Sequence, residues 1–96
     1  MASQFFVKLI PSRPTFNLDM TPDEAALMQQ HVVYWNGMMK QGKVHVFGPV
    51  MDPEGVYGMG VLEVDSEEEA REFAENDPAK LLMSVRVYPM RAVLPS

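Results

Sequence analysis

The chain has 96 residues, and 47% of them are hydrophobic, which suits one folded domain spanning 1–96. It contains no cysteine, so disulfides, thiolate nucleophiles and cysteine-based zinc sites are excluded. The formal net charge is −5, and residues 63–77 carry eight acids against one base, Arg71. This balance argues against nucleic-acid binding, which needs a basic face. The sequence shows neither a membrane-spanning apolar run nor a signal peptide, so we expect a cytoplasmic protein without a membrane partner.

The first strand is predicted at residues 3–10 (SQFFVKLI), which are rich in strand-forming residues and end at Pro11. The next ten residues carry two prolines and no clear period, so we expect a long loop. Arg13 lies in this loop, before Pro14. It is either a solvated surface charge or an anion clamp over a pocket.

An amphipathic helix is predicted within residues 21–42. Thr21 is a suitable N-cap, and Glu24 completes a capping box three residues later. Gly42 follows a lysine and a glutamine and is typical of a helix stop.

The apolar stripe of this helix contains a histidine, His31, between Met28 and Trp35. A buried histidine is either a core residue with both ring nitrogens paired, or an acid–base group that titrates near neutrality. Trp35, Tyr34 and Met28 either belong to the core or line an apolar pocket for a flat small molecule.

A hairpin is predicted from residues 43–51 and 56–65, because residues 52–55 (DPEG) match a type I turn. In the first of its strands we expect one face to carry Val44, Val46 and Val50 and the other to carry His45, Phe47 and Met51.

Three glycines in this hairpin are candidate contact points. Gly48, followed by proline, suggests a bulge, an edge, or the close approach of a ligand or another backbone. Gly58 and Gly60 are two apart and open the same face of their strand, which leaves room for something to pack closely.

The second helix is predicted to begin after Ser66, with Glu69 completing another capping box. Asp77 follows four residues after Phe73, on the extension of the buried face, and Pro78 ends the helix there. Asp77 either caps the short turn that starts at Pro78 or is an acid held next to the core. Residues 83–94 predict the last strand, with a proline that favours a sheet edge.

The order strand, helix, strand, strand, helix, strand predicts an α+β fold, a ferredoxin-like βαββαβ arrangement with a four-stranded antiparallel sheet. Both helices would cover one face of the sheet. The other face is half apolar, so we expect a homodimer in which a second copy covers it.

Several motifs occur in a characteristic order: His31, Gly42, Gly48-Pro49, Gly58, Gly60 and Asp77-Pro78. Together they resemble the YCII-related (YciI-like) proteins over nearly the whole chain. The resemblance implies a dimeric α/β-barrel type of fold and a proposed active site in which His31 and Asp77 act as a dyad. One characterised relative eliminates hydrogen chloride from an aromatic ring compound without a cofactor.

Two functions remain open from the sequence. The first is a small cofactor-independent lyase or isomerase, similar to a dehydrochlorinase, that uses His31 and Asp77 on a small aromatic or carbonyl-containing molecule. Its candidate substrate contacts are Arg13, Met28, Tyr34, Trp35, Gly48, Gly58 and Gly60, and no metal or cofactor is expected. The alternative is a non-catalytic small-molecule-binding or accessory domain of the same fold. A cavity beside the histidine would favour the first, and solid packing around it the second.

Overall fold

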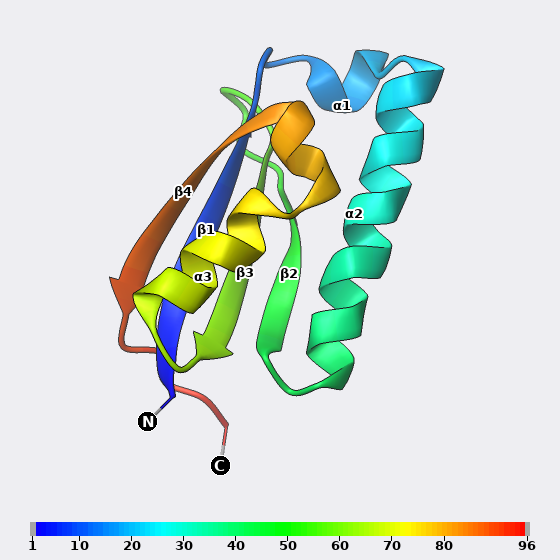
Figure 1. Ribbon diagram of the computed structural model, residues 1–96. Coiled ribbons are helices and arrows are strands. Elements are labelled where there is room, and N and C mark those ends of the chain that lie inside the picture. Colours follow the sequence, from blue (N-terminus) through cyan, green and yellow to red (C-terminus); the bar gives the residue numbers. More distant parts are fainter. Residues whose placement is uncertain (1, 96) are drawn as a thin grey trace.

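The computed structural model describes residues 2–95 as a four-stranded antiparallel sheet with helices against one face (Figure 1). The elements are β1 (Ser3–Pro11), α1 (Phe16–Asp19), α2 (Pro22–Lys40), β2 (Val44–Val50), β3 (Tyr57–Val64), α3 (Glu67–Glu75), the 3₁₀ helix η1 (Pro78–Leu81) and β4 (Met83–Met90). The strands lie in the order β2-β3-β1-β4, which confirms the predicted ferredoxin-like arrangement. The short helices α1 and η1 were not predicted as helices.

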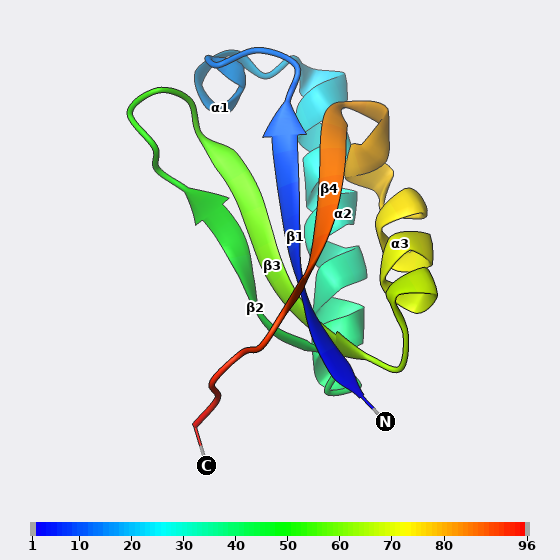
Figure 2. The ribbon, with the colours of Figure 1, turned by 90° about the vertical axis from the view of Figure 1, so that its left-hand side faces the viewer.

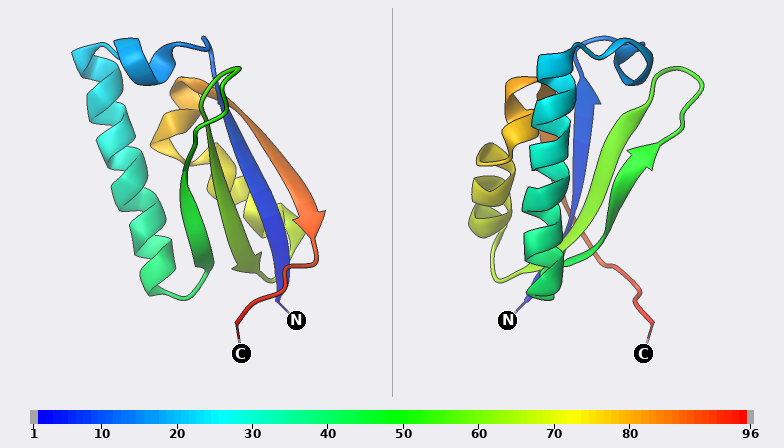
Figure 3. Two further views of the ribbon diagram at one scale, coloured as in Figure 1. Left: turned by 180° about the vertical axis from the view of Figure 1, so that it is seen from behind. Right: turned by 90° about the vertical axis from the view of Figure 1, so that its right-hand side faces the viewer.

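Helix α2 runs along the length of the sheet, with α1 across its start (Figure 3). Its predicted capping box is present, because Oγ1 of Thr21 accepts from the Glu24 N–H at 3.2 Å and the Glu24 carboxylate accepts from the Thr21 N–H at 2.9 Å. At the other end Gly42 has φ +78, a left-handed conformation that terminates the helix. These two ends fix which face of α2 meets the sheet, and His31 and Trp35 are its buried residues.

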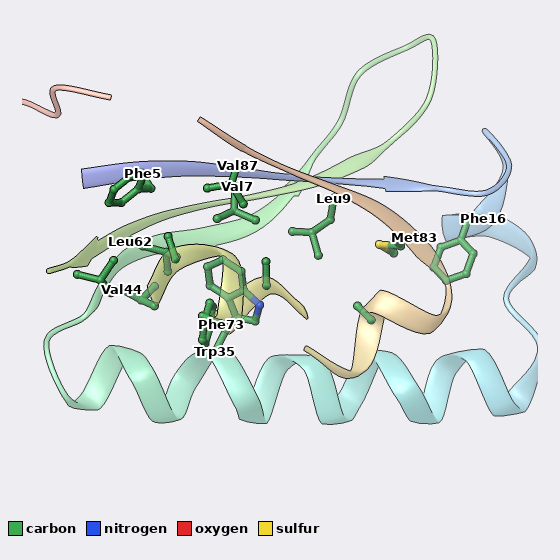
Figure 4. Packing of buried hydrophobic residues seen from close by; sticks show 14 residues of the cluster. Phe5, Val7, Leu9, Phe16, Trp35, Val44, Leu62, Phe73, Met83 and Val87 are labelled. Carbon is green, nitrogen blue, oxygen red and sulfur yellow. The ribbon is translucent and has the colours of Figure 1, made fainter. Parts of the chain in front are cut away.

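The core lies between the sheet and the helices (Figure 4). Phe5, Val7 and Leu9 alternate along β1 toward the helices, as predicted, and all three are buried. Trp35 enters from α2 and is completely buried. Its indole packs edge-on against the ring of Phe73 from α3, with ring centroids 4.8 Å apart. Aromatic side chains therefore join the two helices beneath the sheet.

Strand β2 differs from its predicted pattern. Its register against β3 shifts between Val44 and Val46, so the bulge falls at His45 and not at Gly48. The extra residue reverses the alternation of the side chains that follow. Phe47 pairs with a glycine of β3 on the helix-covered face, whereas Val46 is 49% exposed on the open face. The expectation that Phe47 lies opposite to the buried Val44 was therefore wrong.

Strand β4 occupies a sheet edge, as its proline predicted, but it ends at Met90 instead of continuing to Leu94. The pairing with β1 continues past Pro89 to Met90, opposite Gln4, and β1 itself begins at Ser3, so little of the partner strand remains beyond this point.

The space opened by the β3 glycines is filled from within the same chain. A Cβ atom on Gly60 would overlap the six-membered ring of Trp35. A Cβ atom on Gly58 would lie 3.4 Å from the side chain of Leu9, which is an ordinary contact. At Gly60, therefore, the close neighbour is an indole of this chain and not a ligand or a second backbone.

We predict that Gly60→Ala destabilises the fold by about 1–3 kcal/mol, the usual range for overpacking a core. Alanine is no worse than glycine as a strand residue, so the loss would come from displacement of Trp35. Urea unfolding measures it, and Gly58→Ala is the matched control with little change expected. Equal stability of the two variants would contradict the proposed clash.

Candidate active site

Asp77 lies between the end of α3 and the start of η1, and the local hydrogen bonding fixes its side chain. It is the N-cap of η1 in an extended conformation, and its Oδ1 accepts from the Ala79 N–H at 2.9 Å. Pro78 occupies the first position of η1, where its missing N–H leaves no bond unmade. The predicted capping role of Asp77 is therefore present.

The same carboxylate contacts His31 of α2. The Nδ1 atom of His31 lies 2.9 Å from both Oδ1 and Oδ2 of Asp77. Among the described residues these two are the buried polar side chains, at 8% and 3% exposure. The two roles considered for Asp77 are thus compatible, because one carboxylate both caps η1 and pairs with the histidine.

Trp35 supplies a further donor to this pair. Its Nε1–H donates to Oδ2 of Asp77 at 2.6 Å. The carboxylate therefore accepts N–H groups from Ala79, Trp35 and His31, and it is an acceptor at both oxygens. In the neutral imidazole this arrangement places the proton on Nδ1 and leaves the lone pair on Nε2.

Nε2 of His31 is the free end of the ring. It makes no hydrogen bond within residues 2–95, and the side chain remains 11% exposed. His31 lines a cavity and Asp77 does not, so the histidine is the member of the pair that borders this space.

The cavity has a volume of about 310 Å³ and lies between the end of β1, the α1 region, α2 and the β2–β3 hairpin. In Figure 2 the tip of this hairpin bends away from β1. The lining residues include the polar residues Asn17, His31 and Tyr57, and no aspartate, glutamate, lysine or arginine of residues 2–95 is among them. The remaining lining residues are Leu9, Pro11, Phe16, Met20, Met28, Val32, Phe47, Gly48, Pro49, Val56, Gly58, Met59 and Met83.

Three of the candidate substrate contacts lie around this cavity with His31: Met28, Gly48 and Gly58. Trp35 and Gly60 pack against each other behind it and do not line it.

Tyr34 lies away from the cavity. Its ring stacks on Phe73, with centroids 4.6 Å apart, and its hydroxyl donates to the Phe73 carbonyl at 2.8 Å. Burial, with a smaller contribution from the negative charge of Asp77, raises the pKa of Tyr34 to about 12. Tyr34 is therefore a neutral donor that joins α2 to α3.

Arg13 also lies outside the cavity. Its Nε is 2.7 Å from Oδ1 of Asp19, and its Nη2 is 2.7 Å from Oε1 of Glu24. The guanidinium thus ties the loop and the end of α1 to the first turn of α2. Since α1 provides Phe16 and Asn17 to the lining, Arg13 supports a wall of the cavity without contacting its interior.

Several lining residues were missed by the sequence reasoning. Phe16 and Asn17 belong to α1, which is a single turn in a stretch without periodicity. Phe47 was assigned to the wrong face of the sheet because the bulge at His45, two residues earlier, has no glycine or proline to mark it. The donor role of Trp35 had a signal, because a buried indole N–H needs an acceptor.

Fold and site together define an α+β domain in which a buried histidine–aspartate pair borders a largely apolar cavity. The profile of the YCII-related domain matches residues 4–92, nearly the whole chain, so the chain belongs to this family. No curated protein matches it in sequence.

Among solved structures, the chain is similar to 5-chloro-2-hydroxyhydroquinone dehydrochlorinase (TftG) from Burkholderia phenoliruptrix AC1100, in complex with 2,5-dihydroxybenzoquinone. The TM-score is 0.66 at 19% sequence identity, and the match covers 91% of this chain and 93% of that chain. At this identity the likeness shows a common fold.

No helix in residues 2–95 has the length and apolar character needed to cross a membrane. Over the same residues, no group of three or more acidic or histidine side chains is placed to hold a metal ion. Within the part of the chain that the structure describes, His45 pairs with Glu63, at 3.0 Å on the open face.

We predict that the Arg13→Met variant loses less free energy of unfolding than wild type does as the pH falls into the acid range. The hydrogen bond from Arg13, followed by that from the Thr21 N–H, lowers the pKa of Glu24 from its ordinary 4.5 to about 2. A carboxyl whose folded pKa is depressed stabilises the fold above pH 4.5 and loses this contribution as pH falls toward 2. Wild type should therefore lose more stability over this window than Arg13→Met, measured by urea unfolding, and the difference should shrink in high salt because the group is exposed.

Arg71→Met is the matched control, since it removes an exposed ion pair with Glu67 on α3, away from this cluster. A parallel pH dependence in wild type and Arg13→Met would show that the Glu24 contact contributes nothing.

Proposed function

We propose that this YCII-related protein is a small cofactor-independent enzyme in which His31 transfers a proton and Asp77 orients and supports it. The orientation of His31 carries the proposal, because Nδ1 is bound to Asp77 while the ring borders the cavity with Nε2 unpaired among the described residues. A histidine buried only for packing would have both ring nitrogens paired, whereas Nε2 of His31 has no partner among the described residues and the residue borders a cavity.

The chemistry follows from this geometry. Neutral His31 takes a proton at Nε2 from a carbon next to a carbonyl, or from a phenolic hydroxyl. The Asp77 carboxylate stabilises the imidazolium that forms. The electron pair left on the substrate either expels a leaving group, which is elimination, or accepts the same proton back at another carbon, which is isomerisation. General acid–base help of this kind contributes about 10²–10⁴-fold.

The lining favours an uncharged, largely apolar substrate. The cavity lies near the lower end of the roughly 300–1,000 Å³ typical of small-molecule sites. Its lining within residues 2–95 contains no lysine or arginine, so a carboxylate or phosphate would lose water without gaining such a cationic partner. Phe16 and Phe47 offer aromatic walls to a ring. The similar TftG structure holds a ring compound, 2,5-dihydroxybenzoquinone, which supports a molecule of that shape.

We predict that the protein accelerates exchange of the α-hydrogens of 2-tetralone, an uncharged aromatic ketone, with D₂O. NMR measures this exchange, and the measurement does not require that the natural substrate be known. His31→Gln should lower the rate to that of buffer, and Asp77→Asn should lower it by on the order of 10²-fold or more. His45→Gln is the matched control, because His45 lies on the open face, away from the cavity.

A second arm of this test separates catalysis from binding. Chloride release from 5-chloro-2-hydroxyhydroquinone probes elimination directly. If 2-tetralone shifts the NMR signals of His31 but neither exchange nor chloride release exceeds the rate in buffer, the enzyme proposal fails and a ligand-binding domain of the same fold is supported. An exchange rate that is unchanged in His31→Gln would also contradict the proposal.

We also propose that the protein is a homodimer joined through the open face of the sheet. This face carries apolar side chains without helices over them: Phe6, Ile10, Val46, Val61 and Tyr88. Val46 and Tyr88 are 49% and 44% exposed in the isolated chain, and the rings of Phe6 and Tyr88 lie 6.4 Å apart. Such a patch is usually covered by a partner.

Light scattering at micromolar concentration should therefore give the mass of a dimer, with a buried area above about 1,000 Å² if crystallised. Phe6→Lys places a charge in the centre of the patch and should yield monomers. Lys8→Gln, a change on the same strand face that adds no charge, is the control. A wild-type protein that is monomeric throughout this range would refute the dimer.

A further inference from the structure

We infer that Trp35 is a positioning residue of the site, whose indole N–H holds the Asp77 carboxylate so that His31 presents Nε2 to the cavity. The inference rests on the proposed function of the His31–Asp77 pair. It assigns a specific task to a residue that the sequence suggested only as core or as a pocket wall.

The hydrogen bonds around Asp77 differ in what they fix. The Ala79 N–H reaches Oδ1 and belongs to the same short turn as Asp77. The Trp35 N–H reaches Oδ2 from α2, at 2.6 Å. Without Trp35, Oδ2 keeps His31 as its partner among the described residues, and rotation of the carboxylate about the Cβ–Cγ bond is less restrained. The indole therefore fixes the plane of the carboxylate to which the imidazole is bonded.

Trp35 and His31 are four residues apart on α2, so one rigid helix delivers both donors to one carboxylate. Their rings lie 5.9 Å apart. Phe47 contacts both, with its ring centroid 5.6 Å from that of Trp35 and 6.5 Å from that of His31. A wall residue of the cavity thus touches the histidine and the indole together.

The indole itself has little freedom. Trp35 is fully buried, so water cannot replace Asp77 as the partner of its N–H. The six-membered ring occupies the space left by the missing side chain of Gly60. Phe73 packs against its edge. Gly60 therefore contributes to the position of Asp77 through Trp35, because the missing side chain determines how deeply the indole enters and where its N–H points.

A purely structural role for Trp35 predicts a different result from a positioning role. If the indole only fills the core, its replacement lowers stability and leaves the proton of neutral His31 on Nδ1. If it positions Asp77, its replacement also loosens the imidazole and lets the Nε2–H form appear. The tautomer of His31 separates the two, and no substrate is needed to observe it.

The test is ¹⁵N–¹H NMR of the histidine rings in the intact protein, at a pH where His31 is neutral. Wild type should show the Nδ1–H form alone. Trp35→Phe should lower the ratio of Nδ1–H to Nε2–H by about tenfold, the effect of losing one hydrogen bond to a charged group. Tyr34→Phe is the matched control, because it removes a hydrogen bond from the neighbouring residue of α2 without touching Asp77. A Trp35→Phe spectrum with the wild-type tautomer would overturn the inference.

Gly60→Ala approaches the same contact from the opposite side. Its added Cβ displaces the indole and should shift the tautomer as Trp35→Phe does, whereas Gly58→Ala, which meets only Leu9, should not. An unchanged tautomer in Gly60→Ala, with the indole signal moved, would count against the inference.

Wild type provides a measurement that does not depend on these variants folding. The chain has one tryptophan, so its indole N–H signal is unambiguous. This proton should exchange slowly with solvent and shift strongly in Asp77→Asn. An indole proton that exchanges freely, or is unmoved in Asp77→Asn, would remove the contact on which the inference stands.

The outcome is separable from that of the proposed function. If wild type shows no exchange of 2-tetralone above the rate in buffer, the enzyme proposal fails. A shift of the His31 tautomer in Trp35→Phe is measured independently of that result. Where exchange is present, Trp35→Phe should lower kcat by on the order of 10²-fold, the effect of a small misplacement, with KM little changed. Unchanged kcat together with a shifted tautomer would contradict the positioning role.

Discussion

The fold is organised around a buried carboxylate whose two oxygens must be paired with hydrogen-bond donors. Asp77 accepts N–H groups from α2 and η1, and it is 3% exposed. A hydrogen bond to a buried charged group contributes about 1.5–3 kcal/mol, so the helix and the turn must approach each other closely enough to supply all of the donors. The sheet face beneath adapts to this demand: Gly60 carries no side chain because the indole that reaches Asp77 needs that space. Stability and the orientation of His31 thus depend on the same set of bonds.

The architecture was largely readable from the sequence because its signals are local. The capping box at Thr21, the turn at 52–55 and the proline after Asp77 each fix an end of an element by hydrogen bonds within a few residues. Once the ends are fixed, the periodicity of α2 places His31 inward, and the family resemblance selects Asp77 as its partner. Those two residues do meet, whereas their catalytic role stays a proposal.

The cavity was less predictable because its shape depends on long-range packing. The bulge at His45 arises from pairing with β3 and has no local mark, yet it turns Phe47 inward. The single turn of α1 lies between Arg13 and Glu24, which are eleven residues apart and hydrogen-bonded to each other. Arg13 also pairs with Asp19 at the end of this turn. A helical pattern cannot distinguish core residues from pocket residues. In the structure Trp35 donates its hydrogen bond to Asp77 and Tyr34 donates to the Phe73 carbonyl, and neither lines the cavity.

The proton-transfer pair and the walls of the cavity come from different kinds of structure. His31 and Asp77 are fixed by packed elements, but Asn17, Met20 and Val56 come from α1 and the connecting segments. Connecting segments accept substitutions and changes in length far more readily than a packed core does. Proteins of this architecture can therefore diverge in the molecules they admit while the imidazole chemistry stays the same, so relatives that share the pair need not share a substrate.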